Sequence, residues 1–156
     1  RDLRKAFAGK VVLDGVDLEV PRGESLVVIG GSGTGKSVLM RSIIGLQRPT
    51  EGDIHVFGRS VIDSDPEEDI GIRNRWGVLF QGGALFSTLT VGENVEVPLK
   101  QFYPDIEPDL RHEIARYKVV LSGLPEEATS KFPSELSGGM KKRAGLARAL
   151  ADGSRE

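Results

Sequence analysis

Up to about residue 60 the chain alternates short apolar runs with Gly- and Pro-containing turns, a pattern typical of short β-strands. Residues 11–20 carry β-branched side chains on both sides of Asp14 and Gly15, which predicts strand segments around a turn at those two residues. The run Ser-Leu-Val-Val-Ile at 25–29 has the apolar character of a buried strand. A bounded strand is predicted at residues 52–58 and another buried strand at residues 76–80.

Helical signals are interleaved with these strands. A helix is predicted from about Lys36 to Ile44, with Gly45 as its C-terminal stop. Thr90 and Glu93 have the spacing of a capping box, which predicts a helix start, and Pro98 is expected to end that helix.

The last part of the chain is expected to be mostly helical. Residues 108–124 predict a helix that ends at Gly123 and carries an apolar face made of Leu110, Ile114, Tyr117 and Leu121. The final helix is predicted to begin near Ser137 and to continue through residue 150. The pattern thus predicts one domain, with strands and an α/β core over about residues 1–99 and a helical part over about residues 100–150.

Composition narrows the function classes. The 156 residues contain 21 Lys and Arg against 23 Asp and Glu, and the net charge of −2 gives no bulk attraction to nucleic acid or to anionic lipid. The absence of cysteine excludes disulfides and thiolate metal sites within this sequence. The longest uncharged stretch, 76–92, is interrupted by polar residues and glycines, so no direct membrane insertion is expected.

Isolated polar clusters are given structural interpretations. His55 and His112 lack metal-ligand spacing and are expected to be structural or solvated. The acidic run 63–69 is interpreted as a solvated loop, with cation binding as the alternative. The basic residues 141–143 and Arg148 lie on the final predicted helix, where most are expected to face water or a neighbouring subunit. Without aromatic interleaving, they do not predict a nucleic-acid site.

The strongest chemical signal lies in residues 29–40, where four glycines and a lysine follow the apolar run 25–29. Gly30, four further residues and then Gly35-Lys36-Ser37 satisfy the P-loop pattern, with a predicted strand before it and a helix after it. Glycines let backbone N–H groups turn toward phosphate oxygens, and the helix N-terminus adds partial positive charge. The nucleotide-binding residues predicted here are Gly30, Gly31, Ser32, Gly33, Thr34, Gly35, Lys36, Ser37 and Val38.

Within this loop, Lys36 is expected to reach the β- and γ-phosphates, and the Ser37 hydroxyl to bind Mg²⁺. A P-loop alone leaves kinases, GTPases and motor ATPases open. Neither the Asn-Lys-x-Asp base reader nor the Asp-x-x-Gly switch expected of a guanine-specific protein occurs in the sequence.

Residues 135–150 distinguish among these classes of P-loop protein. They read Glu-Leu-Ser-Gly-Gly-Met-Lys-Lys-Arg-Ala-Gly-Leu-Ala-Arg-Ala-Leu. Here the sequence resembles the ATP-binding-cassette family, whose signature Leu-Ser-Gly-Gly-Gln opens a helix; Met140 replaces the usual glutamine. Ser137 is expected to cap this helix, and Gly138 and Gly139 to allow close backbone approach to phosphate. The resemblance implies that Ser137, Gly138 and Gly139 complete the nucleotide pocket of a second subunit in a head-to-tail dimer that holds two ATP molecules.

The same resemblance implies roles for two more residues. Gln81, in Val-Leu-Phe-Gln-Gly-Gly, corresponds to the Q-loop glutamine that senses Mg²⁺ and the γ-phosphate and relays that state to a membrane partner. Phe7 stands where the family places an aromatic residue that stacks on adenine. The structural alternative for Gln81 is a solvated polar residue, and for Phe7 it is a core aromatic residue.

Within the family, the sequence resembles the ATPase subunits of Mce-associated lipid transporters, the group that includes the maintenance-of-lipid-asymmetry system. Met140 and the two glycines after Gln81 carry this closer likeness. It implies a cytoplasmic ATPase, peripheral on the inner face of the membrane, which binds ATP and Mg²⁺ and drives a permease for phospholipid or another hydrophobic cargo. The implied fold is an α/β P-loop NTPase core with an N-terminal antiparallel β-subdomain and a helical signature subdomain.

The family pattern continues after the final helix with an apolar strand that ends in Asp and Glu, then a switch His. The 156 residues end without them, so we expect a C-terminally incomplete, unstable cassette with no catalytic residue of its own: it binds ATP, and its parent hydrolyses ATP. Two alternatives stay open at this point. One is a soluble ABC-type ATPase without a membrane partner, and the other is a nucleotide-binding module that does not hydrolyse ATP.

Overall fold

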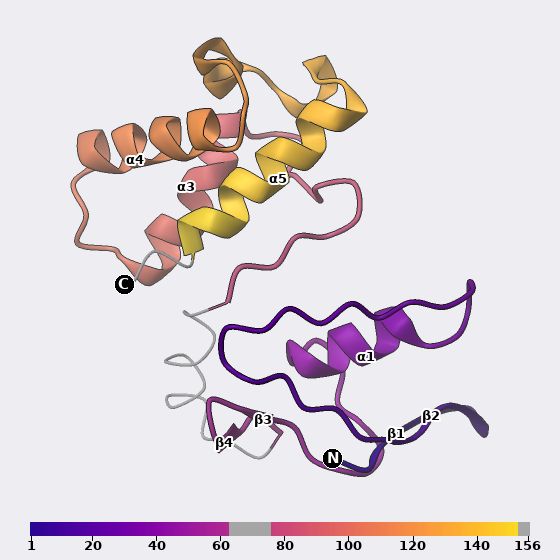
Figure 1. The fold of residues 1–156 in the computed structure, drawn as a ribbon. Coiled ribbons are helices and arrows are strands. Elements are labelled where there is room, and N and C mark those ends of the chain that lie inside the picture. The colour runs from indigo at the N-terminus through magenta and orange to yellow at the C-terminus, as the bar shows by residue number, and fades with distance from the viewer. Residues whose placement is uncertain (63–75, 153–156) are drawn as a thin grey trace. The chain divides into compact units, whose positions relative to one another are not determined.

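The structure is a computed structural model that describes residues 1–62 and 76–152. It divides into two compact units, residues 1–73 and 74–156. Among the described residues, strands and helix α1 (Lys36–Ile43) lie in the first unit, and a helical bundle forms the second (Figure 1). The mixed helix and strand content agrees with the α/β class expected from the sequence. The subdivision near residue 100 stays a prediction, and the acidic run 63–69 lies outside the described residues.

The first unit begins with an antiparallel hairpin of β1 (Leu3–Phe7) and β2 (Lys10–Val16). Its turn is at Ala8 and Gly9, with φ angles of 45° and 84°. The predicted turn at Asp14 and Gly15 is wrong, because β2 continues through both residues. Gly15 has a φ of 64° at a register shift opposite β1, so its left-handed conformation serves a bulge within the strand.

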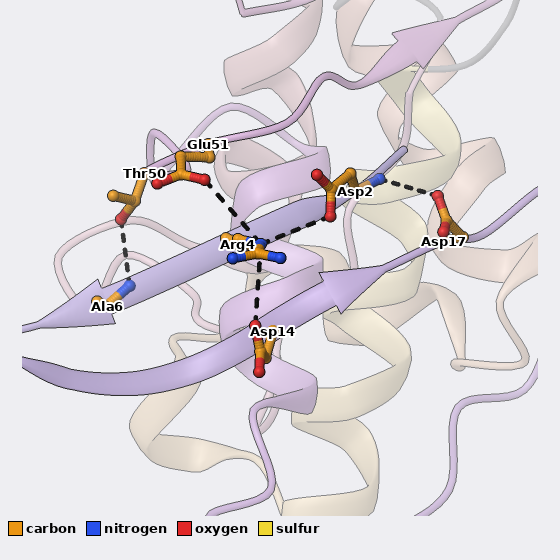
Figure 2. A network of polar contacts seen from close by, with 7 residues as sticks. All are labelled: Asp2, Arg4, Ala6, Asp14, Asp17, Thr50 and Glu51. Atoms are coloured by element: carbon orange, nitrogen blue, oxygen red, sulfur yellow. Dashed lines mark hydrogen bonds and ion pairs between the residues drawn. The ribbon is translucent and has the colours of Figure 1, made fainter.

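A network of polar contacts attaches residues 50–51 to β1 (Figure 2). The Arg4 N–H donates to the Glu51 carbonyl at 3.0 Å, and the Thr50 N–H donates to the Arg4 carbonyl at 2.8 Å. The Arg4 guanidinium also forms ion pairs of 3.5–4.0 Å, with Asp2, Asp14 and Glu51. These ion pairs are exposed and contribute little, about 0–1 kcal/mol each, so the backbone hydrogen bonds hold residues 50–51 against the strand.

Helix α1 (Lys36–Ile43) ends as the sequence predicts. Gly45 has a φ of 74° and donates its N–H to the Ser42 carbonyl at 3.1 Å, while the Leu46 N–H donates to the Arg41 carbonyl at 2.9 Å. These two bonds form a Schellman motif, which satisfies carbonyls that the last helical turn leaves free.

The strand predicted at 52–58 is shorter than expected. It is replaced by a small hairpin of β3 (His55–Val56) and β4 (Arg59–Ser60). Phe57 and Gly58, with φ angles of 52° and 81°, make the two-residue turn between them. This combination of positive φ angles is the turn geometry that suits a tight antiparallel hairpin.

The strand predicted at 25–29 is wrong in this structure. Residues 24–31 have no assigned secondary structure, and Val27 and Ile29 are 77% and 87% exposed. A buried parallel strand needs hydrogen-bonded neighbours and a covering layer on each face. Among the described residues of the first unit, no strand pairs with residues 25–29, so their apolar character alone does not order them into a sheet.

The second unit is built on α3 (Val91–Phe102), α4 (Pro108–Leu121) and α5 (Gly138–Asp152), which pack against one another (Figure 1). Two short 3₁₀ turns, Glu126–Ser130 and Pro133–Glu135, join α4 to α5. The buried apolar core of the unit consists of Val91, Val95, Leu99, Ala115, Val119, Leu124, Ala128, Leu136, Ala144, Ala147 and Ala151. In the described parts of the chain, none of the helices has the length and apolar character needed to cross a membrane.

The predicted start of α3 is confirmed, and its predicted end is wrong. The Glu93 N–H donates to the Thr90 hydroxyl at 3.2 Å, and the Thr90 N–H donates to the Glu93 carboxylate at 2.7 Å, a complete capping box. Pro98, however, lies inside the helix. It removes one backbone hydrogen bond at a cost of about 3 kcal/mol. Burial of its neighbours Val95 and Leu99, worth about 1.5–3 kcal/mol each, offsets that cost.

The apolar face predicted for α4 is displaced from the face that is buried. Leu110, Tyr117 and Leu121 are more than half exposed, and Ile114 alone of the predicted face packs against the core. The fully buried positions are Ala115 and Val119. Their small side chains let α4 approach α3 and α5 closely, so the stripe in contact lies one position away from the larger apolar residues.

The strand predicted at 76–80 is also absent. No strand is assigned to these residues, and Leu79 and Phe80 are exposed. A Cβ atom at Gly77 would overlap the carbonyl oxygen of Ala149 on α5. The segment therefore packs directly on a helix backbone, in place of pairing within a sheet.

Candidate functional site

The glycine-rich loop at 30–35 joins the apolar segment 25–29 to α1 and rests on β2. Gly33 and Gly35 have φ angles of 80° and 94°, a region that side chains other than glycine rarely adopt. Gly35 is buried, and a Cβ there would lie 3.0 Å from the Val12 carbonyl oxygen. Glycine at 35 thus lets the loop turn into the helix while it stays in contact with the hairpin.

The Lys36 side chain folds back over this loop. Its ammonium donates to the carbonyls of Gly30 and Gly31 at 2.7 and 2.5 Å, and its Nζ lies 3.3 Å from the Thr34 Oγ1. The Thr34 hydroxyl donates to the Gly31 carbonyl at 3.0 Å, which fixes it beside the ammonium. The loop therefore holds a positive charge that is bound by neutral carbonyl and hydroxyl oxygens.

The N-terminus of α1 adds hydrogen-bond donors next to this charge. Its N-cap, Gly35, provides no side-chain cap, and the Leu39 N–H, which donates to the Gly35 carbonyl at 2.8 Å, is the first intrahelical donor. The N–H groups of Lys36, Ser37 and Val38 precede that donor and have no acceptor within the helix. They point toward the loop end of the helix, where the macrodipole also favours an anion.

This arrangement fits a nucleotide phosphate chain. A Cβ at Gly30 would lie 3.1 Å from the Thr34 Oγ1 and 3.9 Å from the Lys36 Nζ, so glycine keeps open the space beside the cation. Residues 31–34 and Ser37 are exposed, so a ligand can reach the donors. An exposed hydroxyl at Ser37 is also a suitable oxygen ligand for Mg²⁺.

Phe7, predicted to stack on adenine, ends β1 beside the turn of the first hairpin. It is 42% exposed, and the Lys5 ammonium lies 5.2 Å from the centroid of its ring. This exposure does not agree with the core alternative. The adenine-stacking role of Phe7 stays a prediction.

Gln81 lies in the second unit, in an exposed turn with Gly82. The Gly83 N–H closes this turn by donating to the Phe80 carbonyl at 3.0 Å. The φ angles of Gly82 and Gly83 are 76° and 84°, so both glycines are required by the backbone conformation. Gly83 is also buried against α5, and a Cβ there would overlap the Lys141 carbonyl oxygen.

The predicted cap of the last helix is confirmed. Ser137 precedes α5, and its hydroxyl accepts a hydrogen bond from the Met140 N–H at 3.3 Å. Ser137, Gly138 and Gly139 are exposed, and a Cβ at either glycine would meet no other atom within 4 Å. The start of this helix is therefore accessible, as a phosphate contact from a second subunit would require.

A family model described as ABC transporter matches residues 13–155. The chain belongs to the ABC transporter family. The resemblance expected from residues 136–139 is thereby confirmed.

Individual ABC transporter proteins agree with this assignment. The chain is 44% identical over 150 residues to a probable ribonucleotide transport ATP-binding protein, mkl, of Mycobacterium leprae, covering 96% of this chain and 43% of that protein. It is 41% identical over 152 residues to the methionine import ATP-binding protein MetN of Brucella abortus, covering 97% of this chain and 40% of that protein. The chain thus spans less than half the length of these relatives.

A solved ABC transporter structure supports the fold. A dimeric ATP-binding cassette in a post-hydrolysis state, bound to ADP and Pi, superposes with a TM-score of 0.89 at 33% identity, covering 97% of this chain and 68% of that one. The likeness confirms the P-loop NTPase fold of ABC type expected from the sequence.

The ABC signature departs from the usual glutamine at Met140, and the structure gives a physical reason why methionine is tolerated. Met140 is half-buried and packs against the apolar core of the second unit. A flexible thioether side chain fills such a gap without a polar group that needs a partner.

The structure groups the predicted site residues by unit. Phe7 and the loop from Gly30 to Val38 belong to the first unit, and Gln81 and the residues 137–139 belong to the second.

The two histidines contact carboxylates: His55 lies 3.4 Å from Asp53, and His112 lies 3.1 Å from Glu96. Within the described part of the chain, no group of three or more His, Asp or Glu residues could hold a metal ion.

Arg148 differs from the sequence-based expectation that the cations of the final helix mostly face water or a neighbouring subunit. It is half-buried and donates to the Gly83 and Ala84 carbonyls at 3.0 and 2.8 Å. No local motif gives this contact, because the partners are separated by 64 and 65 positions.

Proposed function

We propose that the protein is the ATP-hydrolysing subunit of an ABC transporter. The observation that carries the proposal is the glycine-rich loop with the Lys36 ammonium inside it, next to N–H groups at the start of α1 that have no acceptor within the helix. A triphosphate supplies the negative charge and the acceptor oxygens that this arrangement lacks. Membership of the ABC transporter family supports the same reading.

Each predicted residue then has a distinct role. Lys36 and the N–H groups of residues 31–38 bind the β- and γ-phosphates, and the Ser37 hydroxyl holds Mg²⁺. Gln81 contacts Mg²⁺ and the γ-phosphate, and Phe7 stacks on adenine. The bound Mg²⁺ supplies electrostatic stabilisation of charge on the phosphoryl group during hydrolysis. The residues that activate water are proposed to belong to the longer parent protein.

A second subunit completes each nucleotide site in this proposal. The exposed Ser137, Gly138 and Gly139 at the start of α5 contact the nucleotide held by the partner, in a head-to-tail dimer. The dimeric state of the similar solved cassette supports this arrangement.

The membrane partner is proposed to be an integral permease, with the ATPase on the cytoplasmic face. The names of the mkl and MetN relatives describe transport and import, which favours a transporter over a soluble ABC ATPase. We propose phospholipid or another hydrophobic molecule as cargo, on the basis of Met140 and the Gly82–Gly83 pair. The names of the relatives specify ribonucleotide and methionine, so cargo needs its own test.

The ATPase proposal is tested on the full-length protein with Lys36→Ala and a control, Arg41→Ala. Both substitutions remove an α1 cation, and Arg41 is exposed at the other end of the helix. We expect Lys36→Ala to weaken ATP binding by roughly 100-fold, the loss of charge-assisted hydrogen bonds to phosphate, and to abolish hydrolysis. Arg41→Ala is expected to match the wild type. Equal ATP affinity and turnover in the wild type and Lys36→Ala would refute the proposal.

The transporter proposal is tested by purification of the full-length protein from membranes in mild detergent. A co-purifying integral membrane protein supports it, and a protein recovered only from the soluble fraction supports the soluble alternative. With the complex in vesicles, stimulation of ATP hydrolysis by phospholipid, ribonucleotide and methionine is then compared. Stimulation by methionine or ribonucleotide alone would overturn the lipid assignment.

A further inference from the structure

The segment around Gln81 lies directly on the backbone of α5. A Cβ at Gly77 would overlap the Ala149 carbonyl oxygen, and a Cβ at Gly83 would overlap the Lys141 carbonyl oxygen. A Cβ at Gly145, on the helix itself, would lie 2.7 Å from the Gly83 Cα. Glycines on both sides thus remove the side chains that would separate the segment from the helix.

Arg148, on α5, stabilises this contact by hydrogen bonds to the segment. Its Nη1 donates to the Ala84 carbonyl at 2.8 Å, and its Nη2 donates to the Gly83 carbonyl at 3.0 Å. The guanidinium carbon also lies 5.9 Å from the centroid of the Phe86 ring. Two donors in a rigid planar fork fix both the position and the orientation of the backbone that they hold.

The held carbonyls belong to the residues that follow the Gln81–Gly82 turn. Gly83 closes that turn through its N–H to the Phe80 carbonyl, so the same residue is fixed by the turn on one side and by Arg148 on the other. The burial of Arg148 lowers its pKa, although an arginine stays protonated in a protein. The cation therefore stabilises two carbonyls in a partly dehydrated setting, where a charged hydrogen bond is stronger than in water.

We propose that Arg148 is a positioning residue for Gln81. By binding the residues that follow the Gln81 turn, it makes the position of that turn depend on the position of α5. The inference rests on the proposed role of Gln81 in ATP hydrolysis. Arg148 and the exposed Ser137 lie 11 residues apart, about 16 Å along the helix. A single helix thus carries the surface offered to the partner subunit and also the arginine that binds the two residues after the Gln81–Gly82 turn.

The proposal requires that loss of Arg148 affects turnover through Gln81 and leaves nucleotide binding intact. In the full-length protein we expect Arg148→Ala to lower kcat about tenfold or more, since small displacements of a positioned group have effects of this size. The ATP dissociation constant is expected to change less than about twofold, because Lys36 and the loop carry binding. Arg148→Lys keeps the charge without the fork and is expected to fall between Arg148→Ala and the wild type.

A double-mutant cycle separates positioning from a general structural role. Gln81→Ala, Arg148→Ala and the double variant are compared, with Lys142→Ala as a control for removal of an exposed cation from the same helix. If Arg148 acts through Gln81, the double variant has the same kcat as Gln81→Ala alone. Multiplied losses, or wild-type turnover in Arg148→Ala, would overturn the proposal.

Hydrogen exchange tests, independently of ATP hydrolysis, whether Arg148 holds residues 83 and 84 in place. The amides of residues 81–86 are expected to exchange about tenfold faster in Arg148→Ala than in Lys142→Ala, because local opening exposes them when the fork is lost. If the wild type hydrolyses no ATP, the proposed function fails, and this exchange measurement still tests the Arg148 contact. Equal exchange in the two variants would overturn it. If Arg148→Ala does not fold, Arg148→Lys replaces it in the turnover, double-mutant and exchange measurements; smaller effects are expected, and values equal to those of Lys142→Ala would overturn the proposal.

Discussion

Asn94 binds both backbone groups of Phe86: its Oδ1 accepts from the Phe86 N–H at 2.7 Å, and its Nδ2 donates to the Phe86 carbonyl at 3.1 Å. The same Nδ2 reaches the carbonyls of Leu89 and Thr90 at 3.1 and 2.8 Å. Asn94 is fully buried, so one amide side chain forms hydrogen bonds with several backbone groups of the loop that leads into α3.

Asn94→Ala is therefore expected to destabilise the protein by roughly 2–4 kcal/mol, because it removes the hydrogen bonds of a fully buried amide, including those to the Phe86 N–H and the Leu89 carbonyl. Urea unfolding of the full-length protein gives the free energy of unfolding. Gln101→Ala removes an exposed amide from the same helix and is expected to change stability by less than about 0.5 kcal/mol. Equal stability of the two variants would contradict the role assigned to Asn94.

The two glycines after Gln81 make a matched pair for a test of close packing. Both have positive φ angles, so Gly82→Ala and Gly83→Ala share a conformational penalty of roughly 1–2 kcal/mol. A Cβ at Gly82 has open space, whereas a Cβ at Gly83 overlaps the Lys141 carbonyl oxygen. Gly83→Ala is expected to cost at least about 2 kcal/mol more than Gly82→Ala in urea unfolding, as overpacking does. The reverse order would show that the segment does not rest on α5.

The capping box of α3 makes a prediction about acid stability. The hydrogen bond from the Thr90 N–H holds the pKa of Glu93 below its ordinary value of 4.5. A lowered folded-state pKa stabilises the fold above the unfolded-state pKa, and that stabilisation is lost as the pH falls through the lowered value. Glu93→Gln is therefore expected to be less stable than the wild type at pH 7, with the difference narrowing below pH 4.5. Unfolding midpoints in urea from about pH 7 to pH 3 test this, and a constant difference would refute it.

The exposure of Phe7 allows its proposed role to be tested without loss of the core. Phe7→Ala is expected to weaken ATP binding roughly tenfold, because stacking on an aromatic ring contributes about 1–3 kcal/mol per base. Phe7→Trp is expected to retain affinity. Inorganic triphosphate, which has no base, is expected to bind the wild type and Phe7→Ala equally. A loss for triphosphate as large as the loss for ATP would assign Phe7 to the fold of the hairpin.

Local chemistry explains which elements could be predicted from the sequence. Gly45 at the end of α1, Thr90 with Glu93, and Ser137 before α5 each form hydrogen bonds within six residues, and each was predicted correctly. The P-loop has the same advantage, because its glycines and Lys36 contact one another within six residues.

Features that depend on distant partners could not be predicted. Apolar character at residues 25–29 does not specify whether a neighbouring strand pairs with them, and periodicity on α4 does not show that Ala115 and Val119 provide the closest approach. Pro98 stays helical because buried neighbours outweigh a missing donor. Arg148 has no motif, since its hydrogen-bond acceptors lie 64 and 65 positions earlier.

The 64 positions between Ala84 and Arg148 fix the order in which the two residues are synthesised. The Ala84 carbonyl leaves the ribosome 64 residues ahead of the arginine that binds it, which is several seconds at roughly 5–20 residues per second. Over this interval Gly77 and Gly83 have no α5 backbone to pack against. The hydrogen bonds from Arg148 to residues 83 and 84 can therefore form only after α3 and α4 have left the ribosome.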